Sequence, residues 1–282
     1  MADNFEQLRD WVGNKEVRND VVTAWPITAL AATVDDQKIC GENGVSVPPG
    51  WHWLLFLEAK PASELGADGH PKRGGFLPPV PLPRRMWAGG RIEFLRPLKI
   101  GENVTRESEI ISVEPKSGNT GTLVFVTVRH TIAGSSSTAI VEDQNIVYRE
   151  AAKKGDPLPP GKQAPTNAQW TRRVMPDAVM LFRYSALTFN GHRIHYDKDY
   201  AINQEHYSGL VVHGPLQATL LLDLCRQNSP TPVKKFDYRA QYPIFSGAAF
   251  TVNGNLDIAS TTADVWTTSE AGNYAMRGTA TF

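Results

Sequence analysis

The sequence predicts an α+β fold of two tandem modules, each an antiparallel sheet wrapped around one long central helix. Three observations support this prediction. A segment rich in Pro and Gly, without hydrophobic periodicity, divides the 282-residue chain near its middle. On each side of it, an apolar helix pattern is followed by segments with the composition of β-strands. Short sequences also recur in the two halves, which indicates a duplicated module.

Residues 1–150 form the first predicted module. Pro48–Glu58 follows a Pro/Gly opening and is rich in aromatic and aliphatic residues, so it is the predicted central helix. Segments rich in Val, Ile, Thr or Phe come after it, and such composition is typical of strands. The predicted strands are Gly90–Pro97, Glu102–Val113, Gly121–Ile132 and Thr138–Arg149.

Residues 151–169 form a predicted linker, because the prolines there deny the backbone helix or sheet hydrogen bonds. Residues 170–282 form the second module. Its central helix is predicted over Pro215–Arg226, where leucines recur at helical spacing. The predicted strands are Lys234–Tyr242, Ala248–Ile258, Thr262–Thr268 and Asn273–Phe282. A sheet wrapped around one long apolar helix is the hotdog, so the chain is predicted to be a double hotdog.

The two modules differ where chemistry is expected. Thr28–Asp35 parallels Arg183–Asn190, and a Pro followed four residues later by Gly occurs at Pro97 and again at Pro243. The first copy has Asp35-Asp36 where the second has Asn190-Gly191, and no His follows five residues later. We therefore expect one active site, in the second module, with the first module supplying wall of the substrate tunnel.

Composition excludes several function classes. Lys plus Arg and Asp plus Glu both number 29, and no basic stripe indicates a nucleic-acid surface. No segment approaches the roughly 18 uninterrupted apolar residues of a membrane span, and Met1–Asp20 is too polar for a signal peptide. Cys40 and Cys225 are too few for a disulfide framework, so the expected compartment is the reducing cytoplasm.

Two neighbouring segments carry the candidate chemistry, Phe182–Ala201 and Gly209–Leu216. The first contains His195, whose imidazole titrates near neutral pH and is the candidate general base. The second has His213-Gly214-Pro215 at the start of the predicted helix. The backbone N–H of Gly214 is therefore a candidate oxyanion donor, although an ordinary turn before a helix would look the same.

These segments, together with the long run Asp68–Gly90, resemble the MaoC-like hydratases and dehydratases of the hotdog fold, most closely the mesaconyl-C4-CoA hydratase group. In that family's motif an acidic residue, an Asn and a His fall on the positions of Asn190, His192 and His195. The resemblance implies reversible hydration of a branched, carboxylated enoyl-CoA. It also implies that the two sheets pair edge to edge.

Asn190 cannot accept a proton, so the acid's share of the work falls to His195 alone or to a neighbour. The candidate neighbours are Asp197, Tyr184 and His192. Asn190 itself would orient the attacking water through its amide oxygen, or else serve only as a turn residue.

The expected ligand is an acyl-CoA thioester, and no metal or other cofactor is expected because the thioester is itself the electron sink. Arginine suits a substrate carboxylate, since its planar fork matches the two oxygens. The candidate substrate-binding residues are Arg85, Arg91, Arg183, Arg193, His192 and His213. His195, Asp197 and Asp199 alternate as strand-borne metal ligands would, but no second ligand cluster supports a metal.

Two alternative functions stay open. One is a 3-hydroxyacyl-thioester dehydratase of fatty-acid synthesis, and the other is a non-catalytic hotdog that binds acyl-CoA. Asn190 in place of an acid keeps the second alternative open. The expected assembly is a homodimer or larger homo-oligomer.

Overall fold

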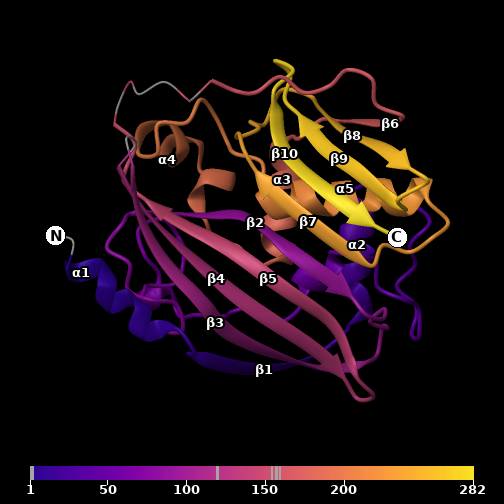
Figure 1. The fold of residues 1–282 in the computed structure, drawn as a ribbon, viewed down its shortest axis with the longest axis horizontal. Helices are drawn as coiled ribbons and strands as arrows, with labels where there is room; N and C mark the ends of the chain where they lie inside the picture. The colour runs from indigo at the N-terminus through magenta and orange to yellow at the C-terminus, as the bar shows by residue number, and fades with distance from the viewer. Residues whose placement is uncertain (1–2, 119–120, 154, 156–157, 159) are drawn as a thin grey trace.

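A computed structural model describes residues 3–118, 121–153, 155, 158 and 160–282 of the chain. Its strands form one antiparallel sheet in the order β1-β3-β4-β5-β2-β7-β10-β9-β8-β6 (Figure 1). The strands of the first half are β1 (Lys15–Val21), β2 (Arg84–Phe94), β3 (Asn103–Gly118), β4 (Gly121–Gly134) and β5 (Thr138–Arg149). Those of the second half are β6 (Trp170–Val174), β7 (Lys235–Ala240), β8 (Phe250–Asp257), β9 (Thr262–Thr268) and β10 (Tyr274–Thr281).

The α-helices are α1 (Asp3–Glu6), α2 (Ala24–Thr33), α3 (Ala178–Leu187), α4 (Lys198–Asn203) and α5 (Gly214–Asn228). Short 3₁₀ helices are η1 (Gln7–Trp11), η2 (Trp51–Leu54), η3 (Ala62–Glu64) and η4 (Arg193–His195). Helices α2, α3 and α5 lie on the same face of the sheet (Figure 1). Within the described ranges, none of these helices is both long and apolar enough to cross a membrane.

The two halves join through β2 and β7, which pair antiparallel from Gly89 opposite Arg239 to Glu93 opposite Lys235. This junction confirms the expected edge-to-edge pairing of the two sheets. Gly89 is required there, because a Cβ at this position would lie 2.3 Å from the carbonyl oxygen of Tyr238. A single core cluster contains residues of both halves, so the junction is part of the hydrophobic interior.

Helix α5 is the central helix of the second half, and its prediction is confirmed. Every residue from Leu216 to Cys225 is buried. The helix contacts β6, β8, β9 and β10 of its own half and also β2 of the first half. Because the sheet surrounds the helix, its first turn is held by packing on several sides.

The predicted central helix of the first half, over Pro48–Glu58, is wrong. Only η2 is helical there, and it has a left-handed glycine, Gly50, before it. Phe56 also has a positive φ of 57°, which stops any continuation as a helix. The apolar pattern correctly predicted burial, since Trp51, Leu54 and Phe56 are all buried, but burial alone does not define a helix. The described residues of the first half therefore contain no long helix in the place where α5 stands in the second.

The internal duplication is visible in backbone geometry. Gly101 and Gly247 have nearly the same left-handed φ, 93° and 92°. Helices α2 and α3 pack against each other, and each is followed two residues later by a left-handed residue, Asp35 and Phe189. Asp35 therefore corresponds to Phe189, and Asp36, one residue further than the sequence pattern predicts, corresponds to Asn190.

All strands up to β5 precede the proposed linker 151–169, and all strands from β6 follow it. Four linker positions, 154, 156, 157 and 159, lie outside the described residues. A second, smaller core cluster belongs to the first half alone and packs η1 and the segment around Val80 against β3, β4 and β5.

Candidate active site at the junction of the two halves

A cavity of about 1410 Å³ is lined by residues of both halves of the chain. The expected site residues His195, His192, Asn190, Gly214 and Arg85 all lie along it. The first half also contributes His52, Trp53, His70, His130 and Glu142, and the second half Phe182, Tyr184, Phe189 and Gln217. The expectation that the first half supplies wall of the ligand cavity therefore agrees with this lining.

His195 ends η4 and its side chain is almost fully buried. Its Nδ1 lies 2.7 Å from the carbonyl oxygen of Val211, and a carbonyl can only accept, so Nδ1 carries the proton. Burial lowers the pKa of His195 to about 4 because the charged form is poorly solvated. At neutral pH the ring is uncharged, and its Nε2 has a free lone pair.

His213 packs against His195 on the side away from the cavity. Its ring stacks on that of His195 with 3.7 Å between centroids, and its Nε2 is 2.8 Å from Oγ of Ser185. His213 is fully buried, and burial holds its pKa well below the ordinary value. It is not among the residues that line the cavity, so it packs against the candidate base His195 and does not itself face the cavity.

Gly214 is the first residue of α5, with His213 as N-cap and Pro215 next in the chain. No acceptor for its backbone N–H is found in the part of the chain that the structure describes, as expected at a helix N-terminus. A Cβ at this position would meet nothing closer than 3.9 Å. Protein packing therefore does not require glycine here, and its small size leaves room for a ligand atom at the amide.

Asn190 closes the turn after α3. Its Oδ1 accepts the backbone N–H of His192 at 3.0 Å, and its own N–H donates to the carbonyl of Ser185 at 2.8 Å. The side chain is half-buried along the cavity. Its amide oxygen is thus engaged by the backbone, in the geometry of an Asx-turn.

A loop of the first half lies directly against this turn, and the sequence interpretation missed its contribution. Asp68-Gly69-His70 has the same pattern as Asn190-Gly191-His192: an acid or amide, Gly, then His. The two glycines touch, because a Cβ on Gly69 would lie 1.9 Å from the carbonyl oxygen of Gly191. The recurrence of this short pattern was the signal in the sequence that could have identified the loop.

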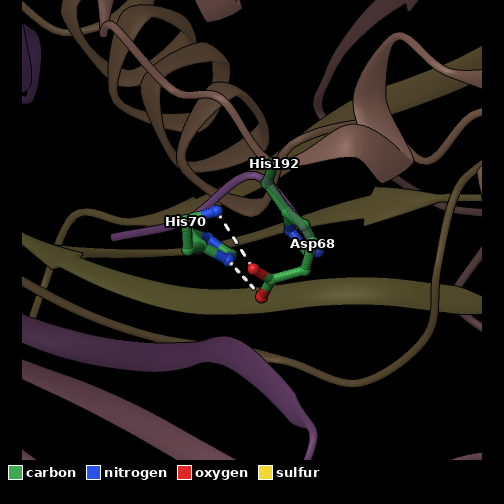
Figure 2. A group of neighbouring side chains, drawn as sticks. All are labelled: Asp68, His70 and His192. Carbon is green, nitrogen blue, oxygen red and sulfur yellow. Dashed lines mark hydrogen bonds and ion pairs between the residues drawn. The ribbon is translucent and has the colours of Figure 1, made fainter. Parts of the chain in front are cut away.

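Asp68 and His70 form a hydrogen-bonded pair beside His192 (Figure 2). The Oδ2 of Asp68 lies 2.9 Å from Nδ1 of His70, and its Oδ1 accepts the backbone N–H of His70 at 3.0 Å. The rings of His70 and His192 are 4.1 Å apart, and those of His192 and His195 are 5.4 Å apart. A row of imidazoles therefore leads from the first half of the chain to the helix start at His213.

The histidines of this row are uncharged at neutral pH, while the carboxylate of Asp68 beside them is ionised. Burial lowers the pKa of His70, and it lowers that of His192 to about 2 with further effect from the neighbouring histidines. Burial alone would raise the pKa of Asp68, but hydrogen bonds from His70 outweigh this and lower it. At neutral pH the cluster consists of an ionised Asp68 among uncharged imidazoles.

The ligand atoms of Asp68, His70 and His192 lie within 4.8 Å of one another, which raises the question of a metal. Both oxygens of Asp68 are engaged by His70, however, and the two rings face each other at a tilt of 37°. Because imidazole lone pairs lie in the ring plane, facing rings do not direct them to one ion. The cluster is therefore arranged as a hydrogen-bonded pair with the tilted ring of His192 against it.

The remaining expected arginines lie elsewhere. Arg193 pairs with Asp197 at 2.8 Å and donates to the carbonyl of Ala67 at 3.0 Å, so it fastens the loop of the first half to the motif. Arg91 is exposed and pairs with Asp237 at 2.6 Å across the β2–β7 junction. Arg183 is exposed on α3. These three side chains do not line the cavity.

Asp197 and Tyr184, two of the residues expected to share the proton transfer, lie in different places. Asp197 caps α4 by accepting the backbone N–H of Tyr200, and it is not a cavity residue. Tyr184 lines the cavity, and its buried hydroxyl has no hydrogen-bond partner in the described part of the chain. Burial raises the pKa of Tyr184 above its ordinary value, so this hydroxyl can only donate or accept as a neutral group.

Comparisons with known proteins agree with this geometry. The family profile described as "Hydroxyacyl-thioester dehydratase type 2" matches residues 50–246. A "Mesaconyl-C(4)-CoA hydratase" of Chloroflexus aurantiacus is 48% identical over 85% of this chain and 86% of its own length. A mitochondrial "Hydroxyacyl-thioester dehydratase type 2" of Schizosaccharomyces pombe is 30% identical over 89% of this chain and 95% of its own.

Among solved structures, a MaoC-like dehydratase from Phytophthora capsici superposes with a TM-score of 0.73 at 13% identity, covering 99% of this chain and 97% of that one. At that identity the likeness shows the fold alone. The profile match and the two relatives show more: this chain is a member of the hydroxyacyl-thioester dehydratase type 2 family of MaoC-like hydratases and dehydratases.

Proposed function

We propose that this chain adds water reversibly across the double bond of a branched, carboxylated enoyl-CoA. The proposed substrate is 3-methylfumaryl-CoA (mesaconyl-C4-CoA), giving citramalyl-CoA, or the related itaconyl-CoA. The observation that carries the proposal is the position of His195: its Nδ1–H is held by the Val211 carbonyl, so its Nε2 lone pair is available beside the cavity. The name of the relative at 48% identity supports the substrate.

In the proposed reaction, water attacks the β-carbon and gives its proton to Nε2 of His195. The π electrons move onto the thioester oxygen, where the N–H of Gly214 and the positive end of α5 stabilise the enolate. The imidazolium of His195 then returns the same proton to the α-carbon, and the enolate collapses to the 3-hydroxyacyl thioester. Because the β-carbon of 3-methylfumaryl-CoA bears methyl and carboxylate groups, the product is a tertiary alcohol.

Replacing His195 tests this assignment. We expect His195→Ala to lower kcat by about 10²- to 10⁴-fold, the range typical of a lost general base, while circular dichroism shows an unchanged fold. The assay follows loss of the conjugated-thioester absorbance with 3-methylfumaryl-CoA. His206→Asn is a matched control, since His206 lies outside the cavity and Asn tolerates its left-handed backbone (φ 58°). Full activity in His195→Ala would refute the role of this residue.

A second candidate is favoured by the family profile and by the Schizosaccharomyces pombe relative, both described as hydroxyacyl-thioester dehydratase type 2. In this case the substrates are straight-chain 3-hydroxyacyl thioesters of fatty-acid synthesis. A panel of enoyl-CoAs separates the two candidates. Selective turnover of branched dicarboxylic thioesters supports the hydratase, and uniform turnover of straight chains supports the dehydratase. Binding without turnover would instead indicate an acyl-CoA binding protein.

We also propose that the enzyme acts in the cytoplasm as a homodimer or larger homo-oligomer. Its two cysteines, Cys40 and Cys225, are both free, which suits a reducing compartment. Light scattering of the purified protein measures the assembly, and a monomer at micromolar concentration would contradict it. Fractionation of the source cells tests the compartment.

A further inference from the structure

We propose that His70, held by Asp68, is a second catalytic residue of this site, and that it binds the attacking water in the place where the family motif has an acid. His70 touches the reacting water, and Asp68 is a positioning residue that acts through it. The inference rests on the proposed function. It explains how a site with Asn190 at the acidic position can still fix a water molecule.

The hydrogen-bonding state of His70 is set by its carboxylate partner Asp68. A carboxylate can only accept, so the 2.9 Å contact with Asp68 puts the proton of His70 on Nδ1 and leaves Nε2 as an acceptor. His195 has the same arrangement, with the Val211 carbonyl in place of the carboxylate. Both rings line one cavity. The site thus contains two neutral imidazoles with free Nε2 lone pairs.

The Oδ1 of Asn190 already accepts the backbone N–H of His192, so only one lone pair of this oxygen is left for a water molecule. Asp68 bonds the backbone N–H of His70 in the same way through Oδ1, but its second oxygen remains for the ring. Of the two matching turns, only the one with a carboxylate can hold its histidine with the proton on Nδ1 and so leave Nε2 as an acceptor.

The Asp68–His70 loop is rigid. The carbonyl of Asp68 accepts the backbone N–H of Arg193 at 2.9 Å, and the contact between Gly69 and Gly191 leaves no space for a side chain. Residue 193 lies two positions before the base His195. The loop of the first half is therefore fixed to the segment that carries the base, as a catalytic contact requires.

In the completed mechanism, the water donates one hydrogen bond to Nε2 of His195 and the other to Nε2 of His70. One proton moves, from water to His195 and then to the α-carbon, and His70 keeps the remaining hydrogen of the new hydroxyl group in place. Atoms and charge balance as before.

The test is Asp68→Asn, an isosteric change that should leave the fold intact. Asn has one oxygen, and the backbone N–H of His70 must keep an acceptor. The amide NH₂ then faces Nδ1 of His70, which must accept, so the ring proton moves to Nε2. Two-bond ¹H–¹⁵N spectra of ¹⁵N-histidine-labelled protein read this tautomer independently of activity.

We expect wild-type His70 to carry its proton on Nδ1 and the Asp68→Asn variant to carry it on Nε2. We expect kcat for hydration to fall by about 10²-fold with KM changed by less than about threefold. Asp199→Asn is the matched control, since Asp199 is exposed on α4 away from the cavity and bonds only Asn203 among described side chains. It should keep both the His70 tautomer and kcat.

A tautomer that switches in Asp68→Asn without loss of kcat would overturn the proposal, because the Nε2 lone pair would then be unused. A wild-type His70 protonated on Nε2 would also overturn it. If the wild type hydrates none of the enoyl-CoAs in the panel, the proposed function fails instead, and the NMR result still stands by itself.

Discussion

Arg85 is our candidate for recognising the carboxylate of the proposed substrate. Its neighbour Arg84 is buried and paired with Glu205 at 2.7 Å. Arg85 lines the cavity and has no carboxylate partner within the described ranges of the chain. Its charge acts on Tyr148, His70 and His192, and a guanidinium without a carboxylate partner suits a substrate with a second, negatively charged end.

Arg85→Gln should therefore discriminate between substrates. Loss of a hydrogen bond to a charged group costs about 1.5–3 kcal/mol, so kcat/KM for 3-methylfumaryl-CoA should fall roughly 10- to 100-fold. A straight-chain enoyl-CoA without a carboxylate is the control substrate, and its kcat/KM should be nearly unchanged. Steady-state kinetics on both substrates make the comparison. Equal losses on the two would mean that Arg85 acts on the shared CoA portion or on the fold.

The sequence identified those site residues that lie close together along the chain. His192, His195 and Gly214 fall within one short stretch, and a local motif can be recognised there. Asp68 and His70 reach the same place only because the chain folds back through the β2–β7 junction, more than a hundred residues from the motif. Local spacing contains no information about such a contact. Arg91 and Arg183 show the converse: they are near the motifs in sequence, but the sheet and α3 turn them outward.

At the scale of elements, α5 was the segment most fully determined by its own sequence. Most of its residues from Leu216 to Cys225 are apolar and all of them are buried, and Pro215 fits the first turn of a helix. The observed helix exceeds the predicted one by one residue at its start and two at its end. The segment at residues 48–58 had similar hydrophobicity but two left-handed positions, Gly50 and Phe56, which periodicity does not reveal.

The strands missed from the sequence are β1 and β6, the two edges of the sheet. β1 contains Lys15, Glu16, Arg18 and Asp20 in seven residues, and β6 contains two arginines in five. Charged residues protect an edge from pairing with another chain, but they also lower the strand-like character of the sequence. The charged residues that protect each edge strand therefore also make it difficult to predict from the sequence.

Asp223 links α5 to η2 and makes the free energy of unfolding depend on pH. It is buried on α5 and accepts the indole N–H of Trp51 at 3.2 Å, and its Oδ2 has no partner among described side chains. Burial raises the pKa of Asp223 to about 6, above its value in the unfolded chain. Between the pKa of Asp223 in the unfolded chain and about 6, the native state binds more protons than the unfolded state. The contribution of Asp223 to the free energy of unfolding is therefore lost as pH rises through about 6.

Asp223→Asn should remove this pH dependence while keeping an acceptor for Trp51. At pH 8 we expect the free energy of unfolding to rise by about 1–3 kcal/mol. At pH 4.5, where the native carboxyl is protonated, the variant and wild type should be nearly equal. Urea unfolding at the two pH values measures the difference. A gain of the same size at both would show that the charge of Asp223 is not its cause.

At the scale of the whole molecule, the candidate active site lies where the two halves of the chain meet. The proposed base and the start of α5 belong to the second half, while His70, Asp68 and Arg85 belong to the first. One core cluster extends across the β2–β7 junction. The cavity is therefore lined by the Asn190–His195 turn of the second half and by the Asp68–His70 loop of the first.

This shared core predicts that the halves unfold together, and Phe236 tests it. Phe236 on β7 is fully buried and lies opposite Ile92 on β2, so it belongs to the junction itself. Phe236→Ala should lower the free energy of unfolding by about 3–5 kcal/mol. Lys235→Ala is the matched control, since it removes only an exposed ion pair to Glu93 across the same junction, worth about 0–1 kcal/mol. Tryptophan fluorescence and far-ultraviolet circular dichroism should give one coincident urea transition in each variant. Two separate transitions in Phe236→Ala, with loss of activity in the first, would show instead that each half has its own stability and that the junction only brings them together.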